Sequence, residues 1–292
     1  MQKYFNSNLI TESSVFEKIR NGEKSEDYET EEQRVGGFTV SRINVKKPTE
    51  KYKSGRYTTV YSSKIHLLSP TEQGRLSFIL ASELKRMLNL YFYKDRKIGE
   101  FLVVGIGNRE IASDSLGPLT AEKIDVTRHI RQIDSATFKK MHRHSISAIN
   151  SGVMGETGMN TAEIIKGIVE RISPDAVIAI DALAAKNTEN LGAVIQISDS
   201  GISPGAGIGN RSSRVDVETI GVPVIAMGIP TVVSAATLVS DVLTKQGIKT
   251  TDSILSELER KRNFFVAPKE CDVVCKIAAG VLADGINGAF SL

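Results

Sequence analysis

Two aspartates lie at sequence positions where an enzyme built on a parallel β-sheet would have its catalytic acid and its catalytic base. Asp181 directly follows the apolar run Ala176–Ile180, and Asp114 lies in the loop after the apolar run Phe101–Ile106. The residues that follow parallel strands share one edge of the sheet, where such sheets bind their ligands. Two neighbouring carboxylates do not both ionise easily, so one keeps its proton as an acid while the other acts as a base on water. A helix N-cap is the structural alternative for each.

Two glycine-rich loops beside these strand ends carry backbone N–H groups suited to an oxyanion or a carboxylate. The residues concerned are Gly105, Gly107, Asn108, Gly205 and Gly207. Three basic residues, Arg109, Lys186 and Arg211, flank the same loops. Charge-assisted hydrogen bonds are the strong kind, so we expect these side chains to hold an acidic group of the substrate.

Two other catalytic patterns are incomplete or absent. The first loop has two glycines of a dinucleotide-binding fingerprint but Glu110 where the third belongs, and there is no H-E-x-x-H helix. No cofactor is expected. His129 lies where a helix after the Asp114 loop would run, which is typical of a surface histidine more often than of a metal ligand.

Short apolar runs separated by amphipathic stretches must position these residues. Continuous apolar runs predict strands buried on both faces, and periodic stretches predict helices. The pattern favours an α/β fold with an open, mostly parallel sheet flanked by helices, in which the residues after Ile106, Ile180 and Ile197 share one rim. The predicted strands are Phe101–Ile106, Ala176–Ile180, Ala193–Ile197 and Val222–Met227, and the predicted helices are Pro70–Met87, Thr161–Arg171 and Glu270–Ala289.

The first part of the chain differs from the rest in its composition and its charge distribution. Residues 1–35 are polar, with a candidate helix over Ser13–Arg20 and partial disorder expected at the start. Alternating patterns in Gly37–Val45 and Arg56–Tyr61 predict a small β-containing region. We therefore divide the chain into a polar N-terminal segment, 1–35, and an α/β domain, 36–292. An acidic run, Glu23–Glu32, and a basic run, Arg42–Arg56, read as solvated faces.

Composition excludes several classes of protein. The 292 residues carry a net charge of +3, too balanced to indicate direct nucleic-acid binding. No stretch has the roughly 18 apolar residues of a membrane span, and no signal peptide is recognisable, so we expect an intracellular, cytoplasmic protein with no membrane partner. Cys271 and Cys275 are too few for a disulfide framework, and buried free thiols are expected.

The sequence becomes recognisable from four blocks, which are VVGIGNREIASDSLGPL, SGVMGETGMN, DAVIAIDALAAK and GVPVIAMGIPTVV. Over Leu102–Asp241, and again near Phe265, it resembles the germination protease (spore protease) family. The resemblance implies an endopeptidase that degrades small acid-soluble spore proteins during germination. The two catalytic aspartates proposed for that family fall in D-x-L-G-P and I-A-I-D-A-L-A-A, which are Asp114 and Asp181 here.

The resemblance also implies a cytoplasmic location in the forespore and spore core, a homotetramer, and synthesis as a zymogen. Part of residues 1–35 would then be a propeptide. Relatives are cut at an acidic residue followed by a hydrophobic residue and Ala, a pattern found here only at Glu110–Ala112, inside the Asp114 loop. We expect the N-terminal segment to restrain activity as a cover over the aspartates, with its acidic run against the basic side chains of the rim.

Two alternatives remain open from the sequence. The family is similar to hydrogenase maturation proteases, which implies a metal-assisted reaction with Asp114, Asp181 and His129 as ligands. The poorly matching N-terminal hundred residues suggest instead a silent member that binds spore proteins without cutting them. Two departures from the family pattern stand near the site: Ser151 replaces a proline, and Ser234 replaces an aspartate.

Overall fold

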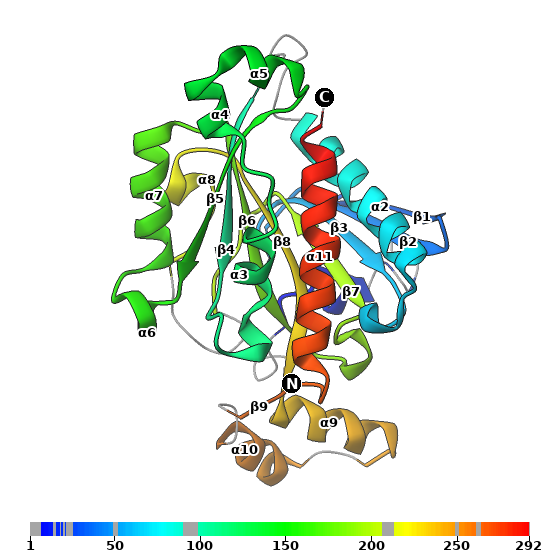
Figure 1. Ribbon diagram of the computed structural model, residues 1–292. Helices are drawn as coiled ribbons and strands as arrows, with labels where there is room; N and C mark the ends of the chain where they lie inside the picture. The colour runs from blue at the N-terminus through cyan, green and yellow to red at the C-terminus, as the bar shows by residue number, and fades with distance from the viewer. Residues whose placement is uncertain are drawn as a thin grey trace.

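The computed structural model describes residues 7–13, 16–17, 19, 21, 26–48, 52–89, 99–205, 213–248, 251–260 and 264–291. Within these residues a nine-stranded sheet runs through the molecule in the order β1-β2-β3-β7-β8-β6-β4-β5, with β9 paired to β8 (Figure 1). The strands are β1 Tyr28–Val35, β2 Phe38–Val45, β3 Gly55–Tyr61, β4 Glu100–Ile106, β5 Ser145–Gly152, β6 Ala176–Ala185, β7 Val194–Ser198, β8 Val224–Ser234 and β9 Phe265–Val266.

The α/β class is confirmed, and one half of the sheet is parallel. Strand β4 pairs in parallel with β5 and β6, and β6 pairs in parallel with β8. Strands β4, β6 and β8 contain continuous apolar runs of the sequence, and they are buried because helices cover both faces, whereas β5 alternates polar and apolar residues and was not predicted. The carboxyl ends of β4, β6 and β8 therefore meet at one edge of the sheet.

The other half of the sheet is antiparallel. Strands β1, β2, β3 and β7 pair successively, and β7 runs antiparallel to β8 with Gln196 opposite Gly228. The residues after Ile197 therefore lie toward the opposite end of the sheet from those after Ile106 and Ile180, so the prediction of one rim for all three is wrong. The predicted N-terminal β region is β1 to β3, and it continues the main sheet through β7.

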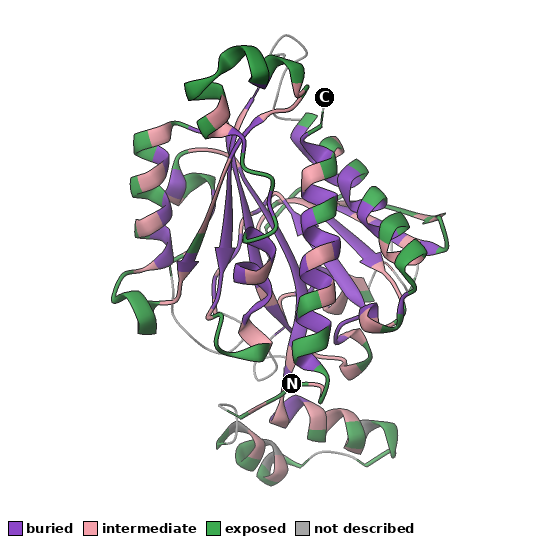
Figure 2. Cartoon of the chain, in the orientation of Figure 1, coloured by how far each residue is buried: buried purple, intermediate pink, exposed green. Residues whose placement is uncertain are grey.

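Two helical layers enclose the sheet, and Figure 2 shows the buried strands between the outward, exposed helix faces. Helices α2, α3 and α11 pack on one face with Ile178, Ile180 and Met227. Helices α7 and α8 pack on the other face with Val177 and Ala179. The helices are α2 Pro70–Asn89, α3 Leu116–Ala121, α4 Arg128–Ile133, α5 Ser135–Lys140, α6 Met154–Thr157, α7 Thr161–Ile172, α8 Val217–Ile220, α9 Ala235–Lys245, α10 Asp252–Arg260 and α11 Cys271–Ala289, with 3-10 turns at Ile10–Glu12, Ile65–Leu67, Ala112–Asp114 and Thr188–Asn190.

The long predicted helices form as the sequence indicates. Helix α7 begins where Asn160 accepts a hydrogen bond from the N–H of Ala162, and Glu163 reaches back to the N–H of Asn160. This reciprocal pair satisfies backbone donors that the first turn leaves free. Helix α11 carries Cys271 and Cys275, and both thiols are free and buried, as expected.

The described part of the N-terminal segment packs against the rest of the chain. Leu9 and Ile10 are completely buried. Strand β1 pairs with β2 along its whole length, and there Glu29 binds Lys46 at 2.7 Å and Glu31 binds Arg42 at 3.0 Å. The described acidic residues thus face the basic run across an edge of the sheet. Within the candidate helix Ser13–Arg20, the described residues Phe16, Glu17 and Ile19 are helical, and residues 14, 15, 18 and 20 lie outside the described residues.

Helices α9 and α10 lie beyond one end of the sheet, where Figure 1 shows them below the main body. Ser234 precedes α9, and its hydroxyl accepts a hydrogen bond from the N–H of Thr237 at 3.0 Å, as an N-cap does. An aspartate could make the same bond, so the departure at this position preserves the contact. None of the helices that the structure describes is long and apolar enough to cross a membrane.

Candidate active site

Asp114 and Asp181 come from the two central parallel strands and the loop above them. Asp181 lies within β6, which is longer than predicted, and its exposed fraction is 5%. Asp114 ends the 3-10 turn Ala112–Asp114, between β4 and α3. Neither aspartate is a helix N-cap, because Asp181 is inside a strand and Ser115 precedes α3 without a side-chain cap bond. Capping therefore does not explain these carboxyls.

Both carboxyls are harder to ionise than an ordinary aspartate. Burial raises the pKa of Asp181 well above its usual value, and the neighbouring charge of Asp114 raises it further. Burial also raises the pKa of Asp114 to about 6, although the N–H of Asn108, which donates to its Oδ2 at 2.6 Å, opposes that shift. Repulsion between the buried Asp181 and the half-buried Asp114 opposes the ionisation of both carboxyls at once.

Glycines let the Asp114 loop approach the strand ends. A Cβ on Gly117 would lie 2.2 Å from the carbonyl oxygen of Ile106 and 2.6 Å from that of Ile180. A Cβ on Gly107, whose φ is +126°, would lie 2.1 Å from the carbonyl oxygen of Asp114. Any larger residue at Gly107 or Gly117 would push the loop away from β4 and β6, so these two glycines fix the position of Asp114.

The predicted oxyanion residues have different surroundings in the structure. Gly105 lies inside β4, paired with strands on both sides, and the N–H of Asn108 already binds Asp114. Gly205 occupies a turn with φ +69° after the β-bridge residue Ile202. Gly207 falls outside the described residues. An oxyanion role for Gly107 stays a prediction.

Of the three predicted basic residues, Arg109 and Lys186 lie within the described part of the chain, and a role in substrate binding stays a prediction for all three. Arg109 binds Glu122 at 2.7 Å, and both side chains are exposed. The N–H of Lys186 is occupied by Glu12, at 2.6 Å. Arg211 falls outside the described residues.

His129 lies at the other end of the sheet from Asp114. It is exposed on α4, where the preceding Arg128 binds Glu100, the first residue of β4, while Asp114 follows the last. The six residue steps of β4, at about 3.3 Å each, span about 20 Å. The alternative that makes His129 a metal ligand with the aspartates therefore does not fit its exposed position on α4. The described residues include no group of three or more His, Cys, Asp and Glu side chains placed to hold a metal ion.

Sequence reasoning missed several residues around the pair. The charge of Glu156, in α6, contributes to the raised pKa of Asp114. Thr231, at the end of β8, donates its hydroxyl proton to the carbonyl oxygen of Ser113 at 2.7 Å and so ties the Asp114 loop to the sheet. Ser151 is buried, and its hydroxyl donates to the carbonyl oxygen of Gly105 at 3.3 Å. Strand-end position was the only signal that could have found Thr231.

The segment Ser7–Ser13 lies along β6 just beyond Asp181. Asn8 exchanges two hydrogen bonds with the backbone of Ala184, at 3.0 and 2.9 Å. The Glu12 carboxylate accepts the N–H groups of Lys186 and Asn187, at 2.6 and 2.9 Å, and the side-chain amide of Asn190 at 2.6 Å. The acidic residue nearest the rim is thus Glu12, whereas the described part of the acidic run binds β2.

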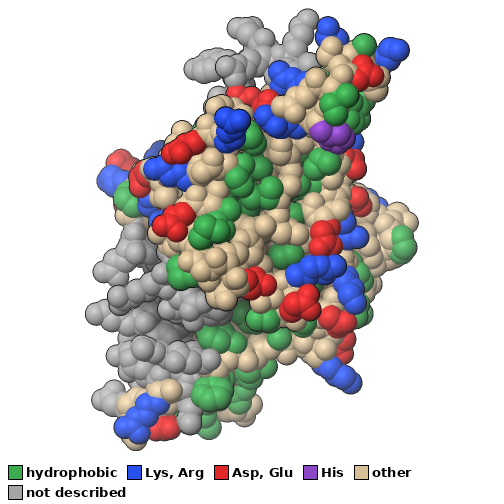
Figure 3. All heavy atoms as spheres, turned by 60° about the vertical axis from the view of Figure 1, so that its left-hand side comes forward, with side chains coloured by type: hydrophobic (Ala, Val, Ile, Leu, Met, Phe, Trp, Pro, Cys, Tyr) green, Lys and Arg blue, Asp and Glu red, His purple; other side chains and the backbone are tan. Residues whose placement is uncertain are grey.

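The face that Figure 3 presents mixes acidic and basic side chains where it is not drawn in grey, with no large area of one sign. This distribution agrees with the small net charge of +3. Nothing on that face resembles the basic stripe of a nucleic-acid-binding protein.

Comparison with known proteins identifies the family of the chain. The model of the germination protease family matches residues 6–249. The chain is 34% identical to the germination protease of Oceanobacillus iheyensis, with 88% of this chain and 85% of the relative covered. It is 34% identical to that of Bacillus subtilis, covering 87% and 83%, and 38% identical to that of Caldanaerobacter subterraneus subsp. tengcongensis, covering 80% and 77%. The chain therefore belongs to the germination protease family and is a peptidase.

Proposed function

We propose that this peptidase is an endopeptidase that degrades small acid-soluble spore proteins during germination and activates water with Asp114 and Asp181. The single observation that carries the proposal is the pair itself: two carboxyls, both with a raised pKa, of which the more buried one responds to the charge of the other. Their positions coincide with the motifs on which the family resemblance rests.

Burial and charge assign the roles. With a pKa of about 6, Asp114 is mostly ionised at neutral pH and serves as the base, whereas Asp181, whose ionisation both burial and the charge of Asp114 oppose, serves as the acid. Asp114 takes a proton from a water molecule while the water oxygen attacks the carbonyl carbon of the peptide bond. Asp181 gives its own proton to the carbonyl oxygen. In the collapse of the tetrahedral intermediate, the proton on Asp114 passes to the leaving nitrogen and a hydroxyl proton returns to Asp181. Each proton is transferred to or from a positioned carboxyl.

We expect kcat/KM to fall as the pH decreases through about 6, because protonation of Asp114 removes the base. Below that pH the rate should decrease about tenfold per pH unit. The upper limit of activity is set by ionisation of Asp181, whose pKa burial and the charge of Asp114 raise well above its usual value. A pH profile of peptide cleavage measures both limbs, which report the pair rather than either residue alone. A rate that stays constant down to pH 4.5 would contradict these roles.

Incubation of the purified chain with a small acid-soluble spore protein tests the activity, with fragments identified by mass spectrometry. Cleavage that persists in a chelator such as EDTA is the expected result. Loss of cleavage on chelation, restored by a divalent metal, would favour the metal-assisted reaction. Binding without fragments would identify a silent member. The Asp114→Asn variant is the control for contaminating proteases.

We further propose that the protein acts in the forespore and spore core as a homotetramer and is made as a zymogen whose propeptide lies within residues 1–35. The family relationship supports these proposals. So does the segment Ser7–Ser13, which lies along the strand that carries Asp181. Mass measurement of the chain before and after activation, together with light scattering, tests the processing and the assembly.

A further inference from the structure

Strand β6 extends beyond the end of β4, so part of one of its edges has no strand beside it. Strand β4 pairs with β6 only as far as Ile180, whose partner is Gly105, whereas β8 pairs with the other edge of β6 up to Ala185. Among the described residues, no strand pairs with the first edge beyond Ile180. A free edge of β6 therefore begins at Asp181, one of the two proposed catalytic residues.

The Asp114 loop lies at the start of this free edge. A Cβ on Gly117, which follows Asp114 in α3, would lie 2.6 Å from the carbonyl oxygen of Ile180. Gly117 therefore packs directly on the last residue of β6 that β4 pairs with. A polypeptide lying along the free edge would reach Asp181 and the Asp114 loop together.

Alternate residues of β6 direct their backbone groups toward the free edge. In a parallel ladder, the N–H and the carbonyl oxygen of one residue bond to one neighbouring strand, and those of the next residue bond to the other. The N–H and the carbonyl oxygen of Ala184 both bond to Asn8, at 2.9 and 3.0 Å, so Ala184 faces away from β8. Ala182, two residues earlier, faces the same way, and its N–H donates to Oδ1 of Asp181 at 2.9 Å. The edge thus presents backbone hydrogen-bonding groups beside the Asp181 carboxyl.

Asn8 already binds this edge in the way that one residue of an added strand would. Its N–H donates to the carbonyl oxygen of Ala184, which is a backbone bond of the kind that pairs strands. Its side-chain oxygen accepts the N–H of Ala184, in the place where an added strand would supply a backbone carbonyl. The edge therefore accepts a polypeptide segment from within the same chain.

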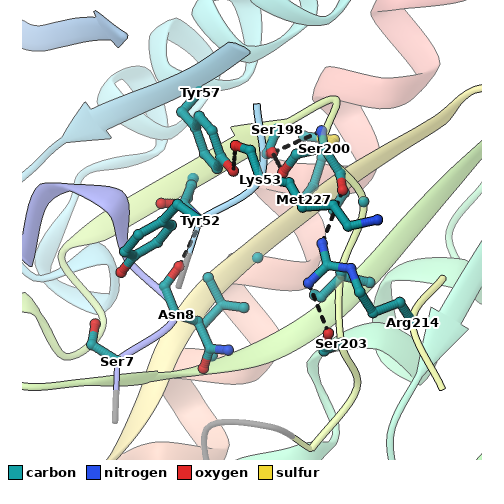
Figure 4. A pocket seen from close by; sticks show the side chains of 16 residues that line it. Ser7, Asn8, Tyr52, Lys53, Tyr57, Ser198, Ser200, Ser203, Arg214 and Met227 are labelled. Carbon is teal, nitrogen blue, oxygen red and sulfur yellow. Dashed lines mark hydrogen bonds between the residues drawn. The ribbon is translucent and has the colours of Figure 1, made fainter. Parts of the chain in front are cut away.

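Hydrogen bonds hold Ser7 and Asn8 at this edge more than close packing does. Both residues line a cavity of about 210 Å³, together with residues of β6, β7 and β8 (Figure 4). The side-chain amide of Gln196 donates to the carbonyl oxygen of Asn8 at 2.9 Å. The completely buried residues of the segment, Leu9 and Ile10, come after Asn8 in the chain. Ser7 and Asn8 can therefore leave the edge while Leu9 and Ile10 stay in the core.

We infer that the substrate polypeptide binds as an extended strand added to the free edge of β6, in the place that Ser7 and Asn8 occupy. The inference rests on the proposed function and specifies how the substrate of that reaction is held. Strand addition takes its affinity from main-chain hydrogen bonds, so the edge recognises an extended backbone rather than a particular side chain. A helical segment has already used its backbone groups internally and must unfold before it can bind in this way.

The first test removes single backbone N–H groups from the substrate. The probe is a peptide that spans a cleavage site found in a small acid-soluble spore protein, and each analogue has an ester oxygen in place of one amide N–H near the cleaved amide. Only alternate residues of an added strand face their partner, so the ester should lower kcat/KM by about 2 to 10 times at every second position, as expected for one lost hydrogen bond. The positions between are the matched controls and should change little. Equal losses at neighbouring positions, or no loss at any position, would overturn the inference.

The second test detects the displacement of Asn8, by amide hydrogen exchange in the Asp114→Asn chain saturated with the uncleaved peptide. The Asn8 amide should exchange faster than in the free chain because its bond to Ala184 is lost, while the Ala184 amide should stay protected by its new partner. The Ile10 amide, which donates to Gln196, is the internal control and should not change. Unchanged exchange at Asn8 would overturn the inference. A wild-type chain that cleaves no spore protein would count against the proposed function instead.

Discussion

Replacing Asp114 or Asp181 with Asn is expected to abolish peptide cleavage without unfolding the chain. The amide cannot exchange a proton with water or with the leaving group, and loss of one acid or base costs about two to four orders of magnitude in rate. The fold should persist because Asn keeps an acceptor oxygen for the N–H groups of Asn108 and Ala182. A variant that retains more than half of the wild-type rate would remove that residue from the mechanism.

The same Asp114→Asn substitution is expected to stabilise the protein at pH 7. The folded chain holds the Asp114 proton more tightly than the unfolded chain, since its pKa is about 6 instead of the ordinary 3.8. The free energy of unfolding therefore decreases as the pH rises from about 4 to about 6 and stays lower above that. The difference corresponds to about 3 kcal/mol, which the neutral amide avoids.

Urea unfolding at pH 7 and at pH 4 measures this effect. Asp114→Asn should be more stable than the wild type at pH 7 and no different at pH 4. The control is Asp125→Asn, which removes an exposed ion pair with Arg143 and should change stability by less than about 1 kcal/mol at either pH. Equal stability of Asp114→Asn and the wild type at pH 7 would show that the Asp114 carboxyl is not desolvated in the folded chain.

Removing residues 1–35 is expected to cost the chain its cooperative fold. The deletion takes away the completely buried side chains of Leu9 and Ile10 and the whole of β1. Losing one large buried side chain typically costs 2–5 kcal/mol, and the total stability of a domain is only about 5–15 kcal/mol. Circular dichroism and thermal unfolding would show the loss. A truncated chain that unfolds cooperatively with unchanged stability would support an independent segment with its boundary at Val35.

Glu12→Gln tests the covering role without this loss. The Glu12 carboxylate accepts three hydrogen bonds from the loop after β6, and its amide replacement accepts them less strongly. If Ser7–Ser13 restrains substrate entry, the variant should cleave peptides several times faster, and the wild type should approach it as salt weakens the contact. Glu29→Gln, which weakens the exposed contacts of this carboxylate with Lys46 and Asn44, is the control. Unchanged turnover in Glu12→Gln would leave the segment without a covering role.

The parallel half of the sheet and the place of the aspartates could be predicted because burial on both faces imposes a pattern. Only a strand covered by helices on both sides tolerates runs such as FLVVGI and AVIAI, and a carboxylate beside such a run has few structural reasons to be there. Pairing direction was not predictable, since the apolar run of β7 reads the same in a parallel or an antiparallel neighbour.

The residues around the site depended on contacts between distant parts of the chain. Ser7–Ser13 is polar enough to suggest a free tail, yet the amide of Gln196 and the backbone beyond Asp181 bind it. Arg214 lies in no recognisable motif, yet it donates to the hydroxyl of Ser203 and to the carbonyl oxygen of Ser200. The local sequence predicts neither the contacts of Ser7–Ser13 nor those of Arg214.

The most direct test of the central claim is an NMR titration of the Asp114 and Asp181 carboxyl carbons in the wild-type chain and in Asp114→Asn. The Asp114 resonance should titrate near pH 6, at the pH where kcat/KM declines, and Asp181 should titrate higher. In Asp114→Asn the Asp181 titration should move to lower pH, because the neighbouring charge is gone. Two aspartates that both titrate near 4, or an Asp181 that titrates identically in the two proteins, would contradict a proton shared by the pair.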